Sequence, residues 1–151
     1  MNFIADAMLG SLAKRLRLLG FDVLYDHTLA DNEILRLALE QGRVILTRDT
    51  GLAARPLARN RVLIKSDHVD DQVQQVLDAF SLLAAGLLTR CSICNQQLSP
   101  LDRDSAGDRV PEHVLRTVTT FFECRGCGRV YWEGSHVKNM AGLRAKKEPA
   151  T

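Results

Sequence analysis

Two pairs of cysteines in the last third of the chain have the spacing of metal ligands. Cys91 and Cys94 form one Cys-x-x-Cys pair, and Cys124 and Cys127 form a second pair after 29 intervening residues. Each pair places two thiolates on one tight turn, and two such turns complete a tetrahedral Cys₄ site. The spacing predicts one structural Zn²⁺, because a closed site has no open position for a substrate or an attacking water.

Disulfide bonds or free thiols are the alternative state for these cysteines, and the start of the chain argues against it. Asp6, Lys14, Arg15 and Arg17 interrupt the N-terminal stretch, which therefore lacks the apolar segment of a signal peptide. No run approaches the roughly 18 apolar residues that a membrane span needs. We therefore expect a soluble, cytoplasmic protein with no membrane partner, in which reduced thiols favour metal binding.

A second set of possible ligands consists of acids that each follow a short apolar run. These runs predict strands at residues 3–5, 23–25, 44–46 and 62–64. The acids that follow them within three residues are Asp6, Asp26, Asp49 and Asp67. Apolar residues at helical spacing predict helices over residues 8–19, 28–42, 50–58 and 70–83. The alternation predicts an α/β fold with a central parallel sheet that is covered by helices on both faces.

The carboxyl ends of parallel strands lie at one edge of a sheet, so we expect these acids to share that edge. Asp31 and Glu33, at the start of the second predicted helix, belong to the same edge. Converging carboxylates repel one another unless a cation joins them, and oxygen ligands suit Mg²⁺ or Mn²⁺. Such a site can activate water against a phosphodiester bond, with Arg48 and Arg15 as candidates to orient the phosphate.

Some of these acids also have a structural explanation. Asp26 is typical of a turn, and Asp67 of a loop or a helix cap. The stretch Thr28–Asp31 has the form of a capping box, and Glu33 is placed to stabilise the helix dipole. For these four acids, position alone leaves both interpretations open.

Asp6 and Asp49 are harder to explain structurally. An acid that ends an apolar strand has little structural purpose, so we expect these two residues to be functional. A phospho-acceptor domain of the receiver type is set aside, because it expects paired acids after the first strand and this chain has Asp6-Ala7-Met8.

Several stretches resemble a PIN-like ribonuclease family named for the C-terminal domain of the exonuclease mut-seven. In the first half they are FIADAMLGSLAKRLRLLG at residues 3–20, DNEIL at 31–35 and LTRDTGL at 46–52. In the second half they are CSIC at residues 91–94 and CRGCGRVYWEGSH at 124–136. The resemblance extends to about residue 140, and the stretches occur in the family's order.

The resemblance implies a PIN-like α/β/α domain with an appended zinc ribbon. It further implies a metal-dependent ribonuclease that cleaves through acids matching Asp6, Asp31 and Asp49, with Glu33 as a companion of Asp31. Asp67 takes roughly the place of a fourth acid, although the local match there is weak. The implied reaction is hydrolysis by a metal-activated water that leaves a 5′-phosphate.

The composition changes after Leu88, where we place a domain boundary. We expect a nuclease domain at residues 1–88, a zinc ribbon at 89–140 and a basic, disordered tail at 141–151. Residues 121–123 and 130–132 predict the two strands of a ribbon hairpin, and residues 101–111 predict a mobile loop.

The ribbon offers cations and an aromatic ring as single-stranded RNA binding requires. The candidate RNA-binding residues are Arg125, Arg129, His136 and Lys138. Trp132 could contribute to the same surface, but a place in the core of the ribbon is favoured.

Composition sets limits on these interpretations. The chain has 151 residues, 46% of them hydrophobic, which is enough for one core and a small satellite domain. Its net charge of +2 does not by itself indicate that the protein binds nucleic acid. Our first hypothesis is a Mg²⁺- or Mn²⁺-dependent endoribonuclease with RNA as its partner. The alternative is a non-catalytic RNA- or protein-binding adaptor that keeps the PIN-like fold.

Overall fold

The computed structural model describes residues 1–82 and 87–134. The elements up to residue 82 are, in order, β1 Asn2–Ala5, the 3₁₀ helix η1 Ala7–Leu9, α1 Gly10–Leu18, β2 Asp22–Leu24, α2 Asp31–Gln41, β3 Val44–Thr47, α3 Thr50–Ala53, β4 Arg61–Leu63 and α4 Val69–Ala79. The elements that follow are β5 Ser99–Leu101, α5 Arg103–Ala106, α6 Glu112–Thr117, β6 Phe121–Glu123 and β7 Val130–Trp132. No helix among these described residues is long and apolar enough to cross a membrane.

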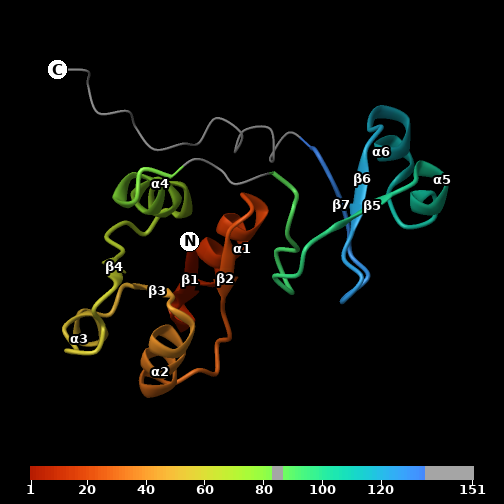
Figure 1. The fold of residues 1–151 in the computed structure, drawn as a ribbon. Coiled ribbons are helices and arrows are strands. Elements are labelled where there is room, and N and C mark those ends of the chain that lie inside the picture. Colours follow the sequence, from red (N-terminus) through yellow and green to blue (C-terminus); the bar gives the residue numbers. More distant parts are fainter. Residues whose placement is uncertain (83–86, 135–151) are drawn as a thin grey trace.

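The first four strands form one parallel sheet in the order β2-β1-β3-β4 (Figure 1). The predicted four strands and the mixed α/β class are confirmed. Because each strand is followed by a helix that returns along the sheet, all four strand ends lie at the same edge. We call this the carboxyl edge, and the opposite one the amino edge.

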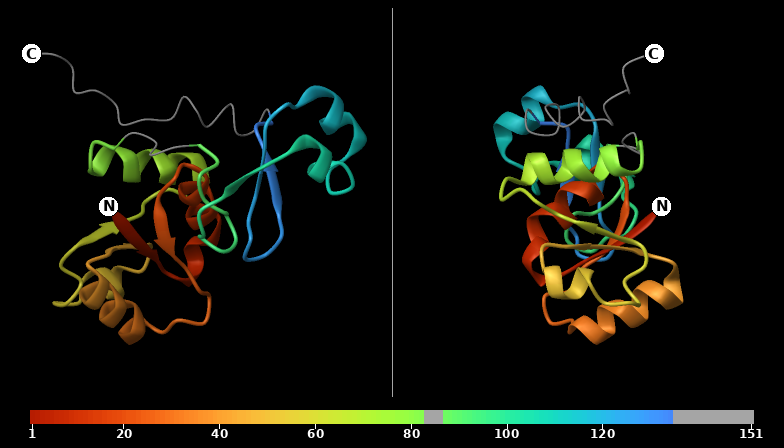
Figure 2. Two further views of the ribbon diagram at one scale, coloured as in Figure 1. Left: turned by 45° about the vertical axis from the view of Figure 1, so that its right-hand side comes forward. Right: turned by 90° about the vertical axis from the view of Figure 1, so that its left-hand side faces the viewer.

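Alternation along the inner strands produces a separate core on each face of the sheet. Phe3 and Ala5 of β1 pack into the apolar cluster that includes residues of α1 and α4. Ile4, between them, packs into the cluster on the other face, with α2 and Leu52 of α3. Figure 2 shows α4 and α2 on opposite sides of the sheet. The prediction that helices cover both faces is confirmed.

Helix boundaries differ from the prediction in several places, and α4 ends at Ala79 rather than at residue 83. The helix expected from residue 28 begins at Asp31, and its N-cap residue Ala30 makes no side-chain cap. Thr28 instead donates its backbone N–H and hydroxyl to Asp26, so the predicted capping box is wrong. The helix expected over residues 50–58 ends at Ala53, shortly before Pro56, because a proline disfavours helical geometry in the residue before it.

The C-terminal part contains more regular structure than the sequence suggested. Strands β5, β6 and β7 form a three-stranded antiparallel sheet, so the predicted hairpin has a third strand. The predicted loop at residues 101–111 is wrong, because Leu101 ends β5 and α5 follows. Ala106 and Val114 pack on Phe121 there, and Trp132 packs against the same cluster. His136, Lys138 and the predicted tail lie outside the described residues.

Candidate functional site

The four cysteines meet in one cluster. Their sulfur atoms lie within 4.8 Å of one another, and all four are free thiols. The sulfur atoms of Cys91 and Cys127 are 3.7 Å apart. A tetrahedral site with Zn–S bonds of about 2.3 Å has sulfur atoms roughly 3.8 Å apart, whereas a disulfide bond needs about 2 Å. The donor set and its spacing therefore fit zinc and exclude a disulfide between these two residues.

Hydrogen bonds around Cys91 prepare this cluster for a cation. The Tyr131 hydroxyl lies 3.0 Å from the Cys91 sulfur, and the backbone N–H of Cys94 donates to it at 3.3 Å. Burial opposes ionisation of Cys91, but these hydrogen bonds and one from the Ile93 backbone lower its pKa to about 7. The hydrogen bond with Cys127, burial and the neighbouring thiolates raise the pKa of Cys94 to about 12. One thiol thus ionises readily, and a bound cation would hold the others as thiolates.

The first cysteine pair docks on the parallel sheet through the buried Arg17 of α1. The Arg17 guanidinium donates to the carbonyl oxygens of Val23, Ser92 and Ile93 at 2.9, 2.9 and 3.1 Å. Asn95 accepts a hydrogen bond from the Val23 backbone N–H. Strand β2 is the outermost strand at one end of the sheet, and the turn at residues 91–95 covers part of its free edge (Figure 1).

Asp22, the first residue of β2, links this contact to β1. Its carboxylate accepts hydrogen bonds from Arg43 at 2.9 Å and from the Asn95 side chain at 2.7 Å. Burial alone would raise the pKa of Asp22, but these hydrogen bonds and the charge of Arg43 hold it below the ordinary value. The ionised carboxylate therefore stabilises the fold above the unfolded-state pKa of about 3.9, and this contribution is lost as the pH falls through the folded-state pKa.

We expect Asp22→Asn to lower the melting temperature by about 2–6 °C at pH 7, and by less as the pH falls below the unfolded-state pKa. Calorimetry of both proteins between pH 3 and pH 7 measures this difference. The exposed Asp104→Asn is the control for loss of one carboxylate. An equal loss of stability at both pH values would contradict an effect of the Asp22 charge.

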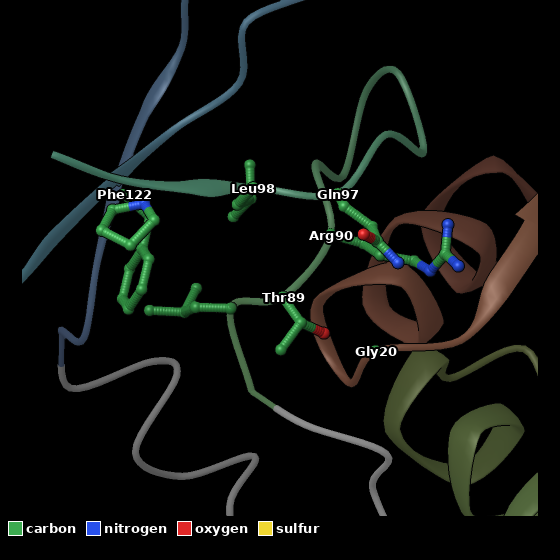
Figure 3. A pocket seen from close by; sticks show the side chains of 8 residues that line it. Gly20, Thr89, Arg90, Gln97, Leu98 and Phe122 are labelled. Atoms are coloured by element: carbon green, nitrogen blue, oxygen red, sulfur yellow. The ribbon is translucent and has the colours of Figure 1, made fainter.

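A hollow of about 480 Å³ lies where residues 91–134, which we call the cysteine module, meet the end of α1. Arg90 and Gln97 pair there in an isolated antiparallel bridge, and their side chains lie next to each other (Figure 3). Gly20, which also lines the hollow, precedes β2 and so lies at the amino edge of the sheet. The hollow and the docking contact are therefore separate from the acids at the carboxyl edge.

At the carboxyl edge, Thr47 joins two of the predicted acids. Asp6 is only 6% exposed, and its two carboxylate oxygens accept hydrogen bonds from the Met8 backbone N–H and the Thr47 hydroxyl. The same hydroxyl accepts a hydrogen bond of 2.9 Å from the Asp49 backbone N–H. Asp49 caps α3 through one oxygen, Oδ1, so its other oxygen is not used by the cap.

The other predicted site residues lie around this pair without forming a cluster. Asp31 and Glu33 are exposed in the first turn of α2, and Asp26 serves a turn, as its structural interpretation required. Arg48 is paired with Asp67, and Arg15 with Asp70. Among residues 1–82 and 87–134, the cysteines are the only group whose ligand atoms are close enough to hold a metal as they stand. Arg125 and Arg129 of the cysteine module are exposed.

Thr47 is the residue of this edge that the sequence did not single out. In the sequence it is simply the last residue of an apolar strand. The structure shows that its side chain is buried, and a buried hydroxyl must be hydrogen-bonded. A threonine at the end of a buried strand, between two candidate acids, is the signal that could have identified it.

We expect Thr47→Val to destabilise the protein by about 1–3 kcal/mol, because it keeps the shape but leaves buried partners unsatisfied. The backbone N–H of Asp49 should also exchange with solvent faster, since its acceptor is gone. Urea unfolding and hydrogen exchange measure the two effects. Thr47→Ser keeps the hydroxyl, so unchanged exchange at Asp49 is expected for it. Equal exchange in both variants would contradict the proposed link.

Comparison with known proteins identifies the family. The model of the Mut7-C RNAse domain matches residues 1–143, which is nearly the whole chain and includes both the acids and the cysteines. No curated protein matches the chain at a significant level, and no solved structure does. The chain therefore belongs to the Mut7-C RNAse domain family.

Proposed function

We propose that this protein is a Mg²⁺- or Mn²⁺-dependent endoribonuclease with a PIN-like fold. The observation that carries the proposal is the position of Asp6, an almost buried carboxylate at the carboxyl edge of a parallel sheet, in a chain of an RNase domain family. A buried carboxylate needs hydrogen bonds or a cation, and its two present donors still leave it with one negative charge. This is the type of oxygen ligand that Mg²⁺ and Mn²⁺ prefer.

The proposed metal ligands are Asp6, Asp31 and Asp49, with Glu33 as a companion of Asp31. A bound divalent ion would lower the pKa of an attacking water and neutralise charge on the scissile phosphate. Thr47 would keep Asp6 in place through its hydroxyl, while the cap on Asp49 leaves one carboxylate oxygen for the ion. The exposed Asp31 side chain would move toward the other two when the ion binds.

In the same proposal the cysteine module is a zinc ribbon with a structural Zn²⁺ that presents cations to RNA. Arg125 and Arg129 are the described candidates, and His136 and Lys138 follow them in the sequence. We place the nuclease domain at residues 1–88 and the ribbon at 89–140. A cytoplasmic location suits the four free thiols, since thiol ligands persist in a reducing compartment.

The test is cleavage of mixed RNA by the purified chain with Mn²⁺, beside an Asp6→Asn/Asp49→Asn double variant. Gel analysis should show fragments with the wild-type protein and none with the variant. Both substitutions keep side-chain size, and the melting temperatures of the two proteins check that the fold is retained. Equal cleavage by both proteins, or none by either, would contradict the nuclease assignment.

A non-catalytic adaptor is the second candidate. It is favoured by one observation, namely that the described carboxylates do not converge into a ready metal group. An adaptor would bind RNA or protein without turnover, so RNA binding without cleavage at saturating Mn²⁺ would select it over the nuclease.

A further inference from the structure

A cleft of about 370 Å³ opens beside Asp6 at the carboxyl edge. Its walls come from η1, the start of α1, the end of β3 and the segment that joins β4 to α4. The polar and charged side chains among its lining residues are Ser11, Arg48, Asp67, His68 and Gln72. The cleft adjoins the acid, because Met8 lines it and the Met8 backbone N–H donates to Asp6.

Arg48 lines this cleft and Arg15 lies on α1 outside its lining, and each is paired with an acid at or just before the start of α4. Arg48 donates to Asp67 at 2.6 Å. Arg15 donates to Asp70 at 2.9 Å. Arg15 lies one helical turn beyond Ser11 on α1, so it extends the wall of the cleft toward α4. Asp67 lies two residues before α4 and Asp70 is its second residue, so both ion pairs reach the start of this helix.

The two partners of each bridge differ in exposure. The side chains of Arg48 and Arg15 are 31% and 20% exposed, whereas those of Asp67 and Asp70 are 81% and 71% exposed. The arginines are therefore held by their surroundings, and the aspartates are free to move into solvent. Exposed ion pairs contribute little to stability because water screens the two charges, so another anion can replace these carboxylates at low cost.

A phosphodiester group is an anion suited to this exchange. Arginine presents several N–H donors in a fixed plane that matches two phosphate oxygens, and such charge-assisted bonds are stronger than neutral ones. A cleft next to a proposed catalytic acid is also where the phosphates that flank a scissile bond would lie.

We propose that this cleft binds RNA phosphates through Arg48 and Arg15, and that Asp67 and Asp70 are built-in competitors for the two arginines. The place of Asp67 in the sequence suggested a fourth metal ligand. In this proposal Asp67 does not bind the metal. It occupies the phosphate site in the free protein and leaves it when RNA enters. The proposal rests on the proposed function only in taking RNA as the substrate.

Binding of a fluorescein-labelled single-stranded RNA to the zinc-loaded full chain, without Mg²⁺ or Mn²⁺, tests the proposal apart from cleavage. We expect Asp67→Asn/Asp70→Asn to bind this RNA about 3- to 10-fold more tightly, because both arginines are released. We expect Arg48→Gln to bind it about 10-fold more weakly, with a smaller salt dependence. Fluorescence anisotropy at several salt concentrations measures both effects.

Glu40→Gln is the matched control for a change in net charge. Glu40 also forms an exposed ion pair with an arginine, Arg36 on α2, and neither residue lines the cleft. This variant should bind RNA like the wild type. Asp67→Asn alone removes the same single charge and is compared with it. If Glu40→Gln tightens binding as much as Asp67→Asn alone, the effect is one of net charge and the local proposal is overturned. Equal affinity of the wild type and Arg48→Gln overturns it as well.

Binding of Mn²⁺ decides the role of Asp67. It is measured as the decrease of the electron spin resonance signal of unbound Mn²⁺. We expect Asp67→Asn to bind Mn²⁺ like the wild type and Asp6→Asn to bind it less. If Asp67→Asn loses Mn²⁺ as Asp6→Asn does, Asp67 is a metal ligand and the proposal is overturned. If the RNA affinities change as expected but no protein cleaves RNA, the nuclease assignment fails and the phosphate cleft stands.

Discussion

Removal of zinc is expected to unfold residues 91–134 and to leave the parallel-sheet domain folded. Residues 91–134 have a small apolar cluster in which Ala106, Val114 and Phe121 are buried and the other members only partly so. A core of this size does not hold a module of this length together by itself. Structural zinc sites contribute on the order of 10–16 kcal/mol in small peptides, so its loss would remove the main source of stability here.

Limited proteolysis before and after chelation measures this effect. Cleavage sites should appear within residues 91–134, and the fragment that contains β1 to α4 should persist. Restoring zinc should restore protection in the wild type but not in Cys91→Ser. Unchanged proteolysis after chelation would contradict a structural role of zinc. So would less than about half a zinc atom per chain in protein purified without chelators.

Removal of zinc also tests how the cysteine module is docked on the parallel-sheet domain. When the turn at residues 91–95 unfolds, Arg17 loses its acceptors Ser92 and Ile93, and the Val23 backbone N–H loses its partner Asn95. The exposed edge of β2 should then exchange its amide protons faster than β1 or β3 and become able to pair with other chains. Hydrogen exchange at Val23 therefore reports whether the turn at residues 91–95 leaves β2 when zinc is removed.

Asp6→Asn is expected to reduce RNA cleavage at least about 100-fold with little change in stability. Asparagine keeps an oxygen to accept from the Met8 backbone N–H, and its amide can donate to the Thr47 hydroxyl. The substitution thus removes the negative charge, keeps the hydrogen bond from Met8 and reverses the one with Thr47. Asp6→Ala should instead destabilise the protein by about 1–3 kcal/mol, because it leaves both buried donors without a partner.

Asp26→Asn is the matched control for this prediction. Asp26 also follows a strand of the parallel sheet, but it is exposed, and its carboxylate accepts from Thr28 in a turn and lies 3.9 Å from the His27 ring nitrogen. Initial rates of cleavage with Mn²⁺ and melting temperatures are measured for the wild type, Asp6→Asn and Asp26→Asn. Similar rates for Asp6→Asn and Asp26→Asn would show that position at the carboxyl edge does not make Asp6 catalytic.

The sequence predicted those features that depend on neighbours in the chain. Apolar runs and helical spacing located the four parallel strands and their helices, because the two periodicities reflect which side chains must be buried. The Cys-x-x-Cys pairs predicted the cysteine cluster for a similar reason, since two ligands on one turn need only local geometry. The predicted loop at residues 101–111 failed because its helix is stabilised by packing on the distant Phe121.

The roles of individual polar residues, by contrast, were decided by the tertiary structure. Thr47 meets Asp6 across 41 residues, and Arg17 meets Ser92 across 75 residues. Pairing between strands and docking of the module bring these residues together, and no local pattern encodes such contacts. An acid after a strand can serve a turn, an ion pair or a metal with the same residue type and spacing. The sequence by itself therefore determined that the cysteines meet and which edge of the sheet carries the acids, and only the fold decided which partner each of them has.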